Sequence, residues 1–232
     1  MKSRAFLALG PLAVTAALLL SGCGSALSPT GIDSSTAADT APTATSSASA
    51  LGAGFYDPDK PPAPEGTLRP EPGSWDDVHP PAGYRVVLLS SGDDAPTRTL
   101  ISSVKSWAAS SDVTVTPVVA SSLDDRLAAV TTAIEKKADL VISVGNGMVD
   151  PLAALSPSAL HQQFLVLGAE IAEPTSNVTA ADWTGAGFRG EGLGTPSHYD
   201  ASTFTDDRAG RALRAGIAAV LSDLNGTVVW VR

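Results

Sequence analysis

The residues best placed to contact a ligand come directly after apolar, strand-like runs. Ser91, Asp93 and Asp94 follow one such run, Asn146 follows another between two glycines, and Trp183 follows a third. The carboxylates could accept hydrogen bonds from ligand hydroxyls or amines, and the backbone N–H groups of the glycine turn could meet an anion or a sugar hydroxyl. Each feature has a structural alternative, because Asp93 and Asp94 could cap the next helix and a tight turn needs glycine anyway.

Established catalytic and cofactor motifs are missing from the sequence. It has no G-x-S-x-G elbow, no H-E-x-x-H pair and no P-loop. Residues 185–190 spell G-x-G-x-x-G, but a dinucleotide site needs a helix to begin inside the motif, and further glycines lead on to Pro196. We therefore interpret residues 185–200 as a mobile loop and expect no cofactor and no enzymatic activity. A hydrolase that uses loop serines and acidic side chains is an open alternative.

Composition argues against two further classes of function. Fifteen Lys and Arg against 24 Asp and Glu give a net charge of −9 and a pI near 4.6, so a nucleic acid would be repelled. One cysteine and three histidines argue against a Cys- or His-based metal site. The length of 232 residues suits one domain with appendages.

The first 22 residues have the parts of a secretory signal. Lys2 and Arg4 precede an apolar run from Phe6 to Leu20, which is too short to span a bilayer comfortably. Leu20-Ser21-Gly22-Cys23 then resembles the lipobox of bacterial lipoproteins, whose cysteine is acylated and becomes the N-terminus. The resemblance implies that lipid on Cys23 holds the protein on the extracytoplasmic face of the cell membrane. The alternative is an ordinary signal with an incidental cysteine.

Residues 23–83 are predicted to form a disordered linker. From Gly24 to Gly54, 26 of 31 residues are Gly, Ala, Ser, Thr or Pro, and eight of the next 29 are proline. Phe55, Tyr56 and Trp75 are unusual in a tether. We expect them to attach its distal half to the folded body, with a binding role as the alternative.

Residues 84–232 are predicted to form one α/β domain. Strands are expected at 84–90, 112–120, 139–144, 164–167, 177–183 and 227–231, and helices beginning near Pro96, Ser122, Asp150 and Thr205. This alternation predicts a doubly wound, mostly parallel sheet in a single Rossmann- or flavodoxin-like lobe. Pro117 favours an edge position for its strand. Functional groups should gather at the carboxyl ends of the strands.

The order of these segments resembles the basic membrane protein (BMP) family, the substrate-binding lipoproteins of ABC importers, several of which bind nucleosides. Besides the lipobox, the resemblance is carried by Ala138–Gly145 (ADLVISVG), Gln163–Gly168 (QFLVLG), Ser176–Thr179 (SNVT) and the Ala/Gly-rich segment 209–220. It implies the first half of a type I periplasmic-binding-protein fold, without the second lobe. The turn Ser91–Asp94 and Gly145-Asn146 correspond to ligand-contacting segments, although Asn146 stands where the family commonly has an aromatic residue.

These observations lead to one functional hypothesis and one alternative. The hypothesis is a lipid-anchored extracytoplasmic protein that binds a nucleoside or sugar for import, with an ABC permease as partner. Ser91, Asp93, Asp94, Asn146 and Trp183 are the candidate ligand contacts. A lone lobe buries less of a ligand than a closed pocket does, so binding should be weak. The alternative is an interaction or sensor module of the cell envelope that has lost ligand binding.

Overall fold

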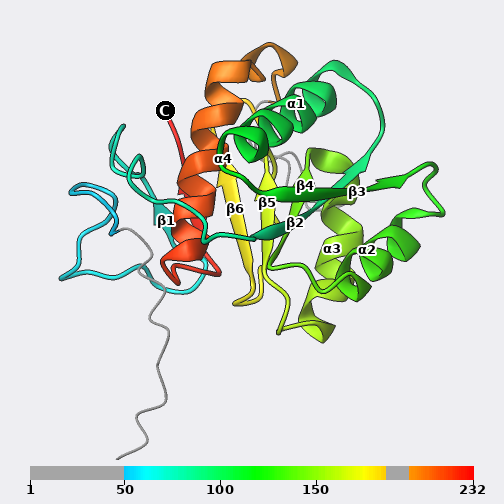
Figure 1. Ribbon diagram of the computed structural model, residues 1–232, viewed down its shortest axis with the longest axis horizontal. Coiled ribbons are helices and arrows are strands. Elements are labelled where there is room, and N and C mark those ends of the chain that lie inside the picture. Colours follow the sequence, from blue (N-terminus) through cyan, green and yellow to red (C-terminus); the bar gives the residue numbers. More distant parts are fainter. Residues whose placement is uncertain (1–49, 187–198) are drawn as a thin grey trace, which may run out of the picture. The chain divides into compact units, whose positions relative to one another are not determined.

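The computed structural model describes residues 50–186 and 199–232 (Figure 1). The predicted signal sequence, the predicted lipidation residue Cys23 and residues 24–49 of the predicted linker lie outside the described residues. Most of the predicted loop 185–200 does so too. None of the described helices is long and apolar enough to cross a membrane.

A seven-stranded sheet forms the centre of the described unit, and all its strand pairs are parallel. The order across the sheet is β1-β7-β6-β5-β4-β2-β3. The strands are β1 (Thr67–Leu68), β2 (Arg85–Ser91), β3 (Thr114–Ala120), β4 (Leu140–Val144), β5 (Phe164–Leu167), β6 (Val178–Asp182) and β7 (Val228–Trp230). The predicted edge position of the Pro117 strand is confirmed, because β3 is the last strand on its side.

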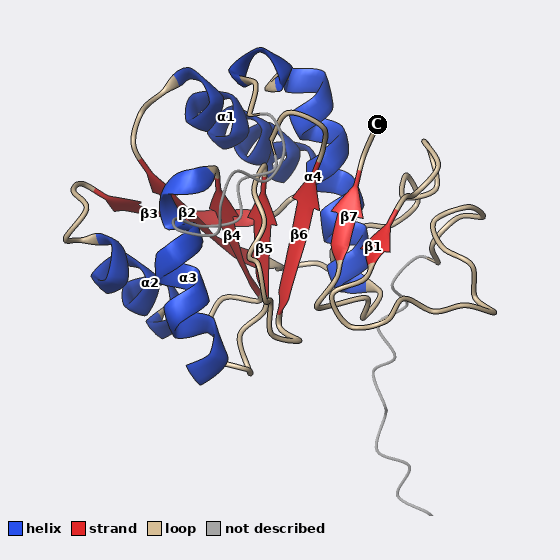
Figure 2. Cartoon of the chain, turned by 180° about the vertical axis from the view of Figure 1, so that it is seen from behind, coloured by secondary structure: helices blue, strands red, loops and turns tan. Residues whose placement is uncertain are grey.

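Helices cover both faces of the sheet (Figure 2). The helices α1 (Ala95–Ser110) and α4 (Asp206–Leu221) pack together on one face, and α2 (Arg126–Glu135) and α3 (Val149–Leu155) pack together on the other. Successive residues of a strand therefore enter different cores. Val86 and Leu88 of β2 belong to the core under α1 and α4, and Val87 and Leu89 belong to the other core. This double burial explains the unbroken apolar runs of the sequence and confirms the doubly wound α/β fold.

Two helix starts confirm the sequence prediction in detail. At α1 the Asp94 carboxylate accepts a hydrogen bond from the Thr97 backbone N–H at 3.0 Å, and Pro96 lies in the first turn. At α4 the Thr205 hydroxyl accepts one from the Arg208 N–H at 3.3 Å. These side chains satisfy donors that the helix leaves unpaired at its N-terminus.

The start of α2 differs from the prediction. Ser122 accepts a hydrogen bond from the Asp125 N–H at 3.3 Å, but in a turn that precedes the helix, which begins at Arg126. Leu123 and Leu127, whose helical spacing predicts a buried face, are 72% and 52% exposed. The smaller side chains of Ala129, Val130 and Ala133 face the sheet instead.

The folded unit also begins earlier than the predicted boundary at residue 84. Phe55 and Trp75 are buried in the core under α1 and α4, and Tyr56 packs against it, as expected of residues that attach the segment. The same segment also contributes β1, which extends the sheet by pairing with β7. Burial of large aromatic side chains and closure of a free sheet edge offset the entropy of ordering this proline-rich segment. A strand of two residues is too short to show an alternating apolar pattern, so β1 could not be predicted from the sequence.

Candidate ligand site at the carboxyl edge of the sheet

The strand order creates a switch point between β2 and β4. From β2 the chain crosses to β3 on one side, whereas from β4 it crosses to β5 on the other. The crossovers diverge there, and a crevice at the carboxyl ends of the two strands is where doubly wound sheets bind ligands. We call this place the β2/β4 edge and define it by Ser91, Asn146, Gly147 and Arg126.

A glycine brings the two strand ends together at the β2/β4 edge. A β-carbon on Gly147 would lie 3.1 Å from the Ser91 Cβ and 3.3 Å from its carbonyl oxygen, so a larger residue would push the strand ends apart. Gly145 has a φ of 70°, which favours glycine sterically. The structural alternative for these glycines is therefore confirmed, and the residue after Asn146 lies against Ser91.

Ser91 is held by a residue that the sequence analysis did not select. Its hydroxyl accepts a hydrogen bond from Nε of Arg126 at 3.1 Å, and Ser91 is only 8% exposed. Arg126 is the first residue of α2, 35 positions away, and no local pattern links the two. The guanidinium brings a positive charge to an edge for which the sequence had suggested only acidic and neutral groups.

Asn146 has an unused acceptor. Its Oδ1 is buried and has no hydrogen-bond partner within residues 50–186 and 199–232. A buried acceptor without a partner costs free energy that a ligand donor could recover. Asn146 is therefore the predicted contact residue that the geometry favours most.

Asp93 and Asp94 differ in whether their carboxylates are free to contact a ligand. Both carboxylate oxygens of Asp94 are used at the helix start, by the Thr97 N–H and by the Thr97 hydroxyl at 2.7 Å. For Asp94 the capping alternative holds, and a ligand would have to break the cap. Asp93 has an exposed side chain, and its backbone carbonyl accepts a hydrogen bond from Arg98.

Trp183 is a core residue in this structure rather than a ligand contact. It is 1% exposed, its ring N–H donates to the Thr203 hydroxyl at 3.1 Å, and its ring meets Phe204 edge-on at 5.0 Å. Its position after a strand end suggested access to the edge, but the indole turns inward under the segment that precedes α4.

Tyr199 is an exposed aromatic residue near Asp94, which follows β2. Tyr199 is 49% exposed, and its ring centroid lies 5.7 Å from that of Phe204. The Asp94 carboxylate is close enough to interact electrostatically with the Tyr199 hydroxyl. Partial burial, together with that negative charge, raises the pKa of the Tyr199 phenol, so the hydroxyl stays protonated at neutral pH. Nothing in the local sequence identified Tyr199, because its place depends on packing between distant segments.

A buried pair of acids lies at the carboxyl ends of β5 and β6. Asp182 ends β6 with no exposed surface, and Glu170, which follows β5, is 8% exposed. Burial, with the neighbouring Glu170 charge, raises the pKa of Asp182 to about 8, although the Trp183 N–H donates to its Oδ1 at 2.8 Å and favours the ionised form. Asp182 is therefore mostly protonated at neutral pH.

The hollows that we describe on residues 50–186 and 199–232 lie away from the β2/β4 edge. They occur between α1 and α4, along residues 50–80, and beside the turn before β7. Within the same residues, no group of three or more His, Cys, Asp or Glu is arranged to hold a metal ion.

No protein-family model matches the chain, and a comparison with curated proteins finds no match. Three solved structures are similar to the chain. Two are ABC transporter solute-binding proteins, one from Aeropyrum pernix K1 (20% identity, TM-score 0.40) and the 5-methylthioribose transporter protein from Thermotoga lettingae in complex with 5-methylthioribose (18% identity, TM-score 0.37). The third is a fragment described as a lipoprotein from Peptoclostridium difficile 630 (14% identity, TM-score 0.44). The Aeropyrum match covers 44% of this chain and 29% of that protein, and the Thermotoga match covers 44% and 33%. The lipoprotein match covers 60% of this chain and 98% of the fragment.

The matched region thus spans about a third or less of the two solute-binding proteins. Likenesses this distant carry no argument about function. The class of protein follows instead from the sheet order, since β3-β2-β4-β5-β6 is the order 2-1-3-4-5 of a flavodoxin-like, doubly wound α/β lobe. Membership of the BMP family stays a prediction.

Proposed function

We propose that the chain is a lipid-anchored extracytoplasmic protein whose α/β unit binds a small polar solute, a nucleoside or a sugar, at the β2/β4 edge. The observation that carries the proposal is the buried Oδ1 of Asn146, which has no partner among the described residues and precedes the glycine that approaches Ser91 at the switch point of the sheet. A ligand hydroxyl or amine would donate to this oxygen.

The neighbouring groups suit the rest of such a ligand. The exposed Asp93 carboxylate can accept hydrogen bonds from hydroxyls, and the guanidinium of Arg126 has donors beyond the one that binds Ser91. The half-exposed ring of Tyr199 offers a flat apolar surface for a base or a sugar ring. These few contacts support only weak binding, with a Kd in the millimolar range, or about −4 kcal/mol.

Calorimetric titration of the full chain with adenosine, uridine and ribose tests this proposal. We expect weak binding of at least one of them, and Asn146→Ala should weaken it about fivefold, the effect of losing one hydrogen bond. Asn225→Ala is the matched control, because Asn225 also has a buried, unpaired Oδ1 but lies in the turn before β7. Equal losses in the two variants would argue against the β2/β4 edge, and micromolar binding would contradict the weakness expected from so few contacts.

The lipid anchor requires a separate test. The Leu20-Ser21-Gly22-Cys23 motif supports acylation of Cys23, and two acyl chains hold a protein on a membrane stably. Metabolic labelling with a fatty-acid analogue should mark the natural protein, whereas Cys23→Ala should lose both the label and the membrane attachment. An unlabelled natural protein would refute the anchor without touching the ligand site.

An exposed apolar group supports the interaction module as a second candidate function. Val119 at the end of β3, Leu123 and Leu127 are 60%, 72% and 52% exposed, and β3 is an edge strand. Crosslinking in the native envelope separates the candidates, because a permease partner supports transport and a wall or signalling protein supports the alternative. Leu123→Ser should reduce capture of a partner that binds through this group, and unchanged capture would exclude the group as the contact.

A further inference from the structure

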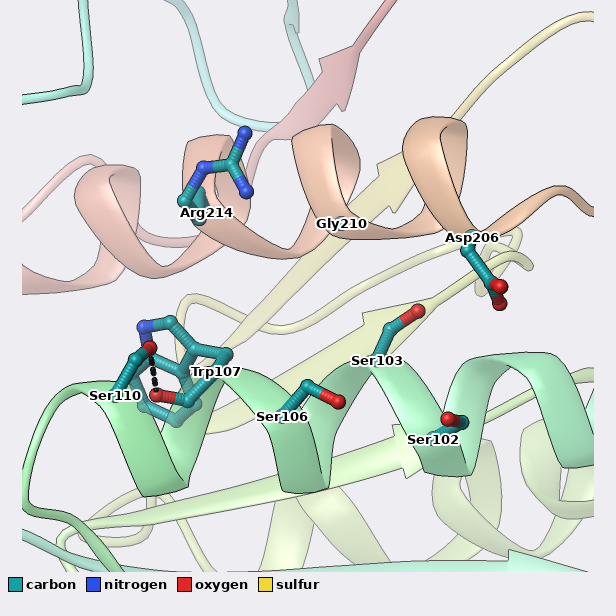
Figure 3. A pocket seen from close by; sticks show the side chains of 8 residues that line it. All are labelled: Ser102, Ser103, Ser106, Trp107, Ser110, Asp206, Gly210 and Arg214. Atoms are coloured by element: carbon teal, nitrogen blue, oxygen red, sulfur yellow. Dashed lines mark hydrogen bonds between the residues drawn. The ribbon is translucent and has the colours of Figure 1, made fainter.

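A polar groove runs between α1 and α4, on a helical face of the unit rather than at the carboxyl edge of the sheet (Figure 3). Its volume is about 340 Å³. On the α1 side it is lined by Ser102, Ser103, Ser106 and Ser110, which follow the helical repeat, together with Trp107. Residues of α4 form the other side. We call this hollow the α1–α4 groove.

One hydroxyl in the α1–α4 groove lacks a partner. Ser103 is 9% exposed, and its Oγ makes no hydrogen bond within the described part of the chain. A helical serine usually returns its hydroxyl to a backbone carbonyl one turn earlier, and Ser103 does not. In Figure 3 its oxygen and the Asp206 carboxylate both occupy the space between the two helices. The groove therefore holds a buried polar atom whose hydrogen-bonding capacity is unused.

The charged residues of the α1–α4 groove are also available. Neither the Asp206 carboxylate nor the Arg214 guanidinium makes a hydrogen bond or ion pair with another residue within 50–186 and 199–232, whereas the Arg211 side chain on the same helix pairs with Asp207 at 2.9 Å. Arg214 folds along α4, since its Nη1 lies 3.6 Å from where a β-carbon of Gly210 would be. The missing side chain at Gly210 leaves room beside this guanidinium.

A second hollow extends the α1–α4 groove beyond the length of one small ligand. An adjoining hollow of about 420 Å³ shares Trp107, Ser110 and Arg214 with it and reaches Trp75. Trp75 is 4% exposed, and its ring N–H is a second buried donor without a partner among the described residues. The half-buried Trp107 borders both hollows, and together they form an extended channel lined by polar and apolar groups.

The chemistry of this channel selects among ligand classes. An apolar ligand would leave the serine hydroxyls unpaired, and an anion would meet Asp206, Asp76 and Asp112 against the one guanidinium of Arg214. An uncharged chain with many hydroxyls suits every group present. Its hydroxyls pair with serine, carboxylate and guanidinium, and its C–H faces pack on the indole of Trp107.

We infer that the α1–α4 groove binds an oligosaccharide of more than one sugar ring, at a site separate from the β2/β4 edge and independent of the function proposed for that edge. The unpaired Ser103 hydroxyl and Trp75 N–H are the groups that the sugar would satisfy. The two hollows set the length of chain that is covered.

Titration of the full chain with chitotetraose, cellotetraose and maltotetraose, followed by calorimetry and tryptophan fluorescence, tests this site. We expect at least one tetrasaccharide to bind and to change the tryptophan emission. Gly210→Leu, which fills the groove with a good helix former, should abolish binding. Ala109→Leu is the matched control, because it adds the same side chain to an exposed position of α1 outside the groove and should leave binding unchanged.

Ser103→Ala provides a second readout. Because the hydroxyl has no partner among the residues that the structure describes, its removal should leave the melting temperature unchanged or raise it, while affinity for the tetrasaccharide falls about fivefold. A lower melting temperature with unchanged affinity would assign Ser103 a structural role and overturn its place in the site. Absence of binding by all three probes up to about 5 mM would overturn the inference itself. Binding that Gly210→Leu leaves intact would overturn it as well.

Discussion

Replacement of Asp182 by asparagine should remove most of an unfavourable pH dependence of stability. Asp182 has no exposed surface, and its pKa is raised from 3.8 to about 8 in the folded protein. Between these two pH values the folded state holds a proton that the unfolded state has released, so stability falls as the pH rises. Below about pH 4 both states are protonated, and above about pH 8 both have lost the proton, so the slope vanishes outside this window.

The magnitude follows from the difference in bound protons. One proton more in the folded state costs about 1.4 kcal/mol per pH unit, so the natural protein should lose up to about 3 kcal/mol between pH 5 and pH 7 through Asp182. The amide introduced by Asp182→Asn would keep an oxygen that accepts from the Trp183 N–H and would carry no charge to bury beside Glu170. The stability of this variant should therefore change much less over the same range.

Urea unfolding at pH 5, 6 and 7 measures the difference, since the linear extrapolation yields the free energy of unfolding at each pH. Asp77→Asn is a suitable control, because Asp77 is exposed and its replacement should leave the natural slope intact. Parallel pH profiles of the natural protein and Asp182→Asn would refute the assignment of a protonated carboxyl to the end of β6.

Three further substitutions test how the edge and the early segment are built. Asp94→Ala should cost about 1 kcal/mol through loss of the α1 cap and should leave solute binding at the β2/β4 edge nearly unchanged, by chemical denaturation and calorimetry. Gly147→Ala should cost about 1–3 kcal/mol, because the new β-carbon would crowd Ser91, and an unchanged melting curve would contradict this close approach. Phe55→Ala should cost about 3–5 kcal/mol if residues 50–83 belong to the folded unit, whereas a linker residue would cost nothing measurable.

Much of the α/β architecture could be predicted because its signals are local. The apolar runs of β2, β4 and β5 are continuous since both faces of each strand are buried, and they mark the strands to within a residue or two. The caps Asp94 and Thr205 likewise act on backbone groups three residues away. The turn at Asn146 could be selected for the same reason, because a buried strand and two glycines surround it.

The rest of the candidate site could not be predicted because it depends on contacts between distant segments. Arg126 binds Ser91 across 35 residues, and Tyr199 reaches the edge by packing on Phe204. Trp183 had the position of an edge residue, yet the fold buries it against the same phenylalanine.

By itself, the sequence determined the alternation of strands and helices, the cap residues and the place of the glycine turn, since each of these depends on hydrogen bonds and apolar periodicity within a few residues. Only the tertiary structure decided that residues 50–83 join the folded unit, which side chains face the β2/β4 edge, and that α1 and α4 leave a polar groove between them. The physical reason is that burial and pairing are properties of the packed chain, in which a side chain's neighbours come from any part of the sequence.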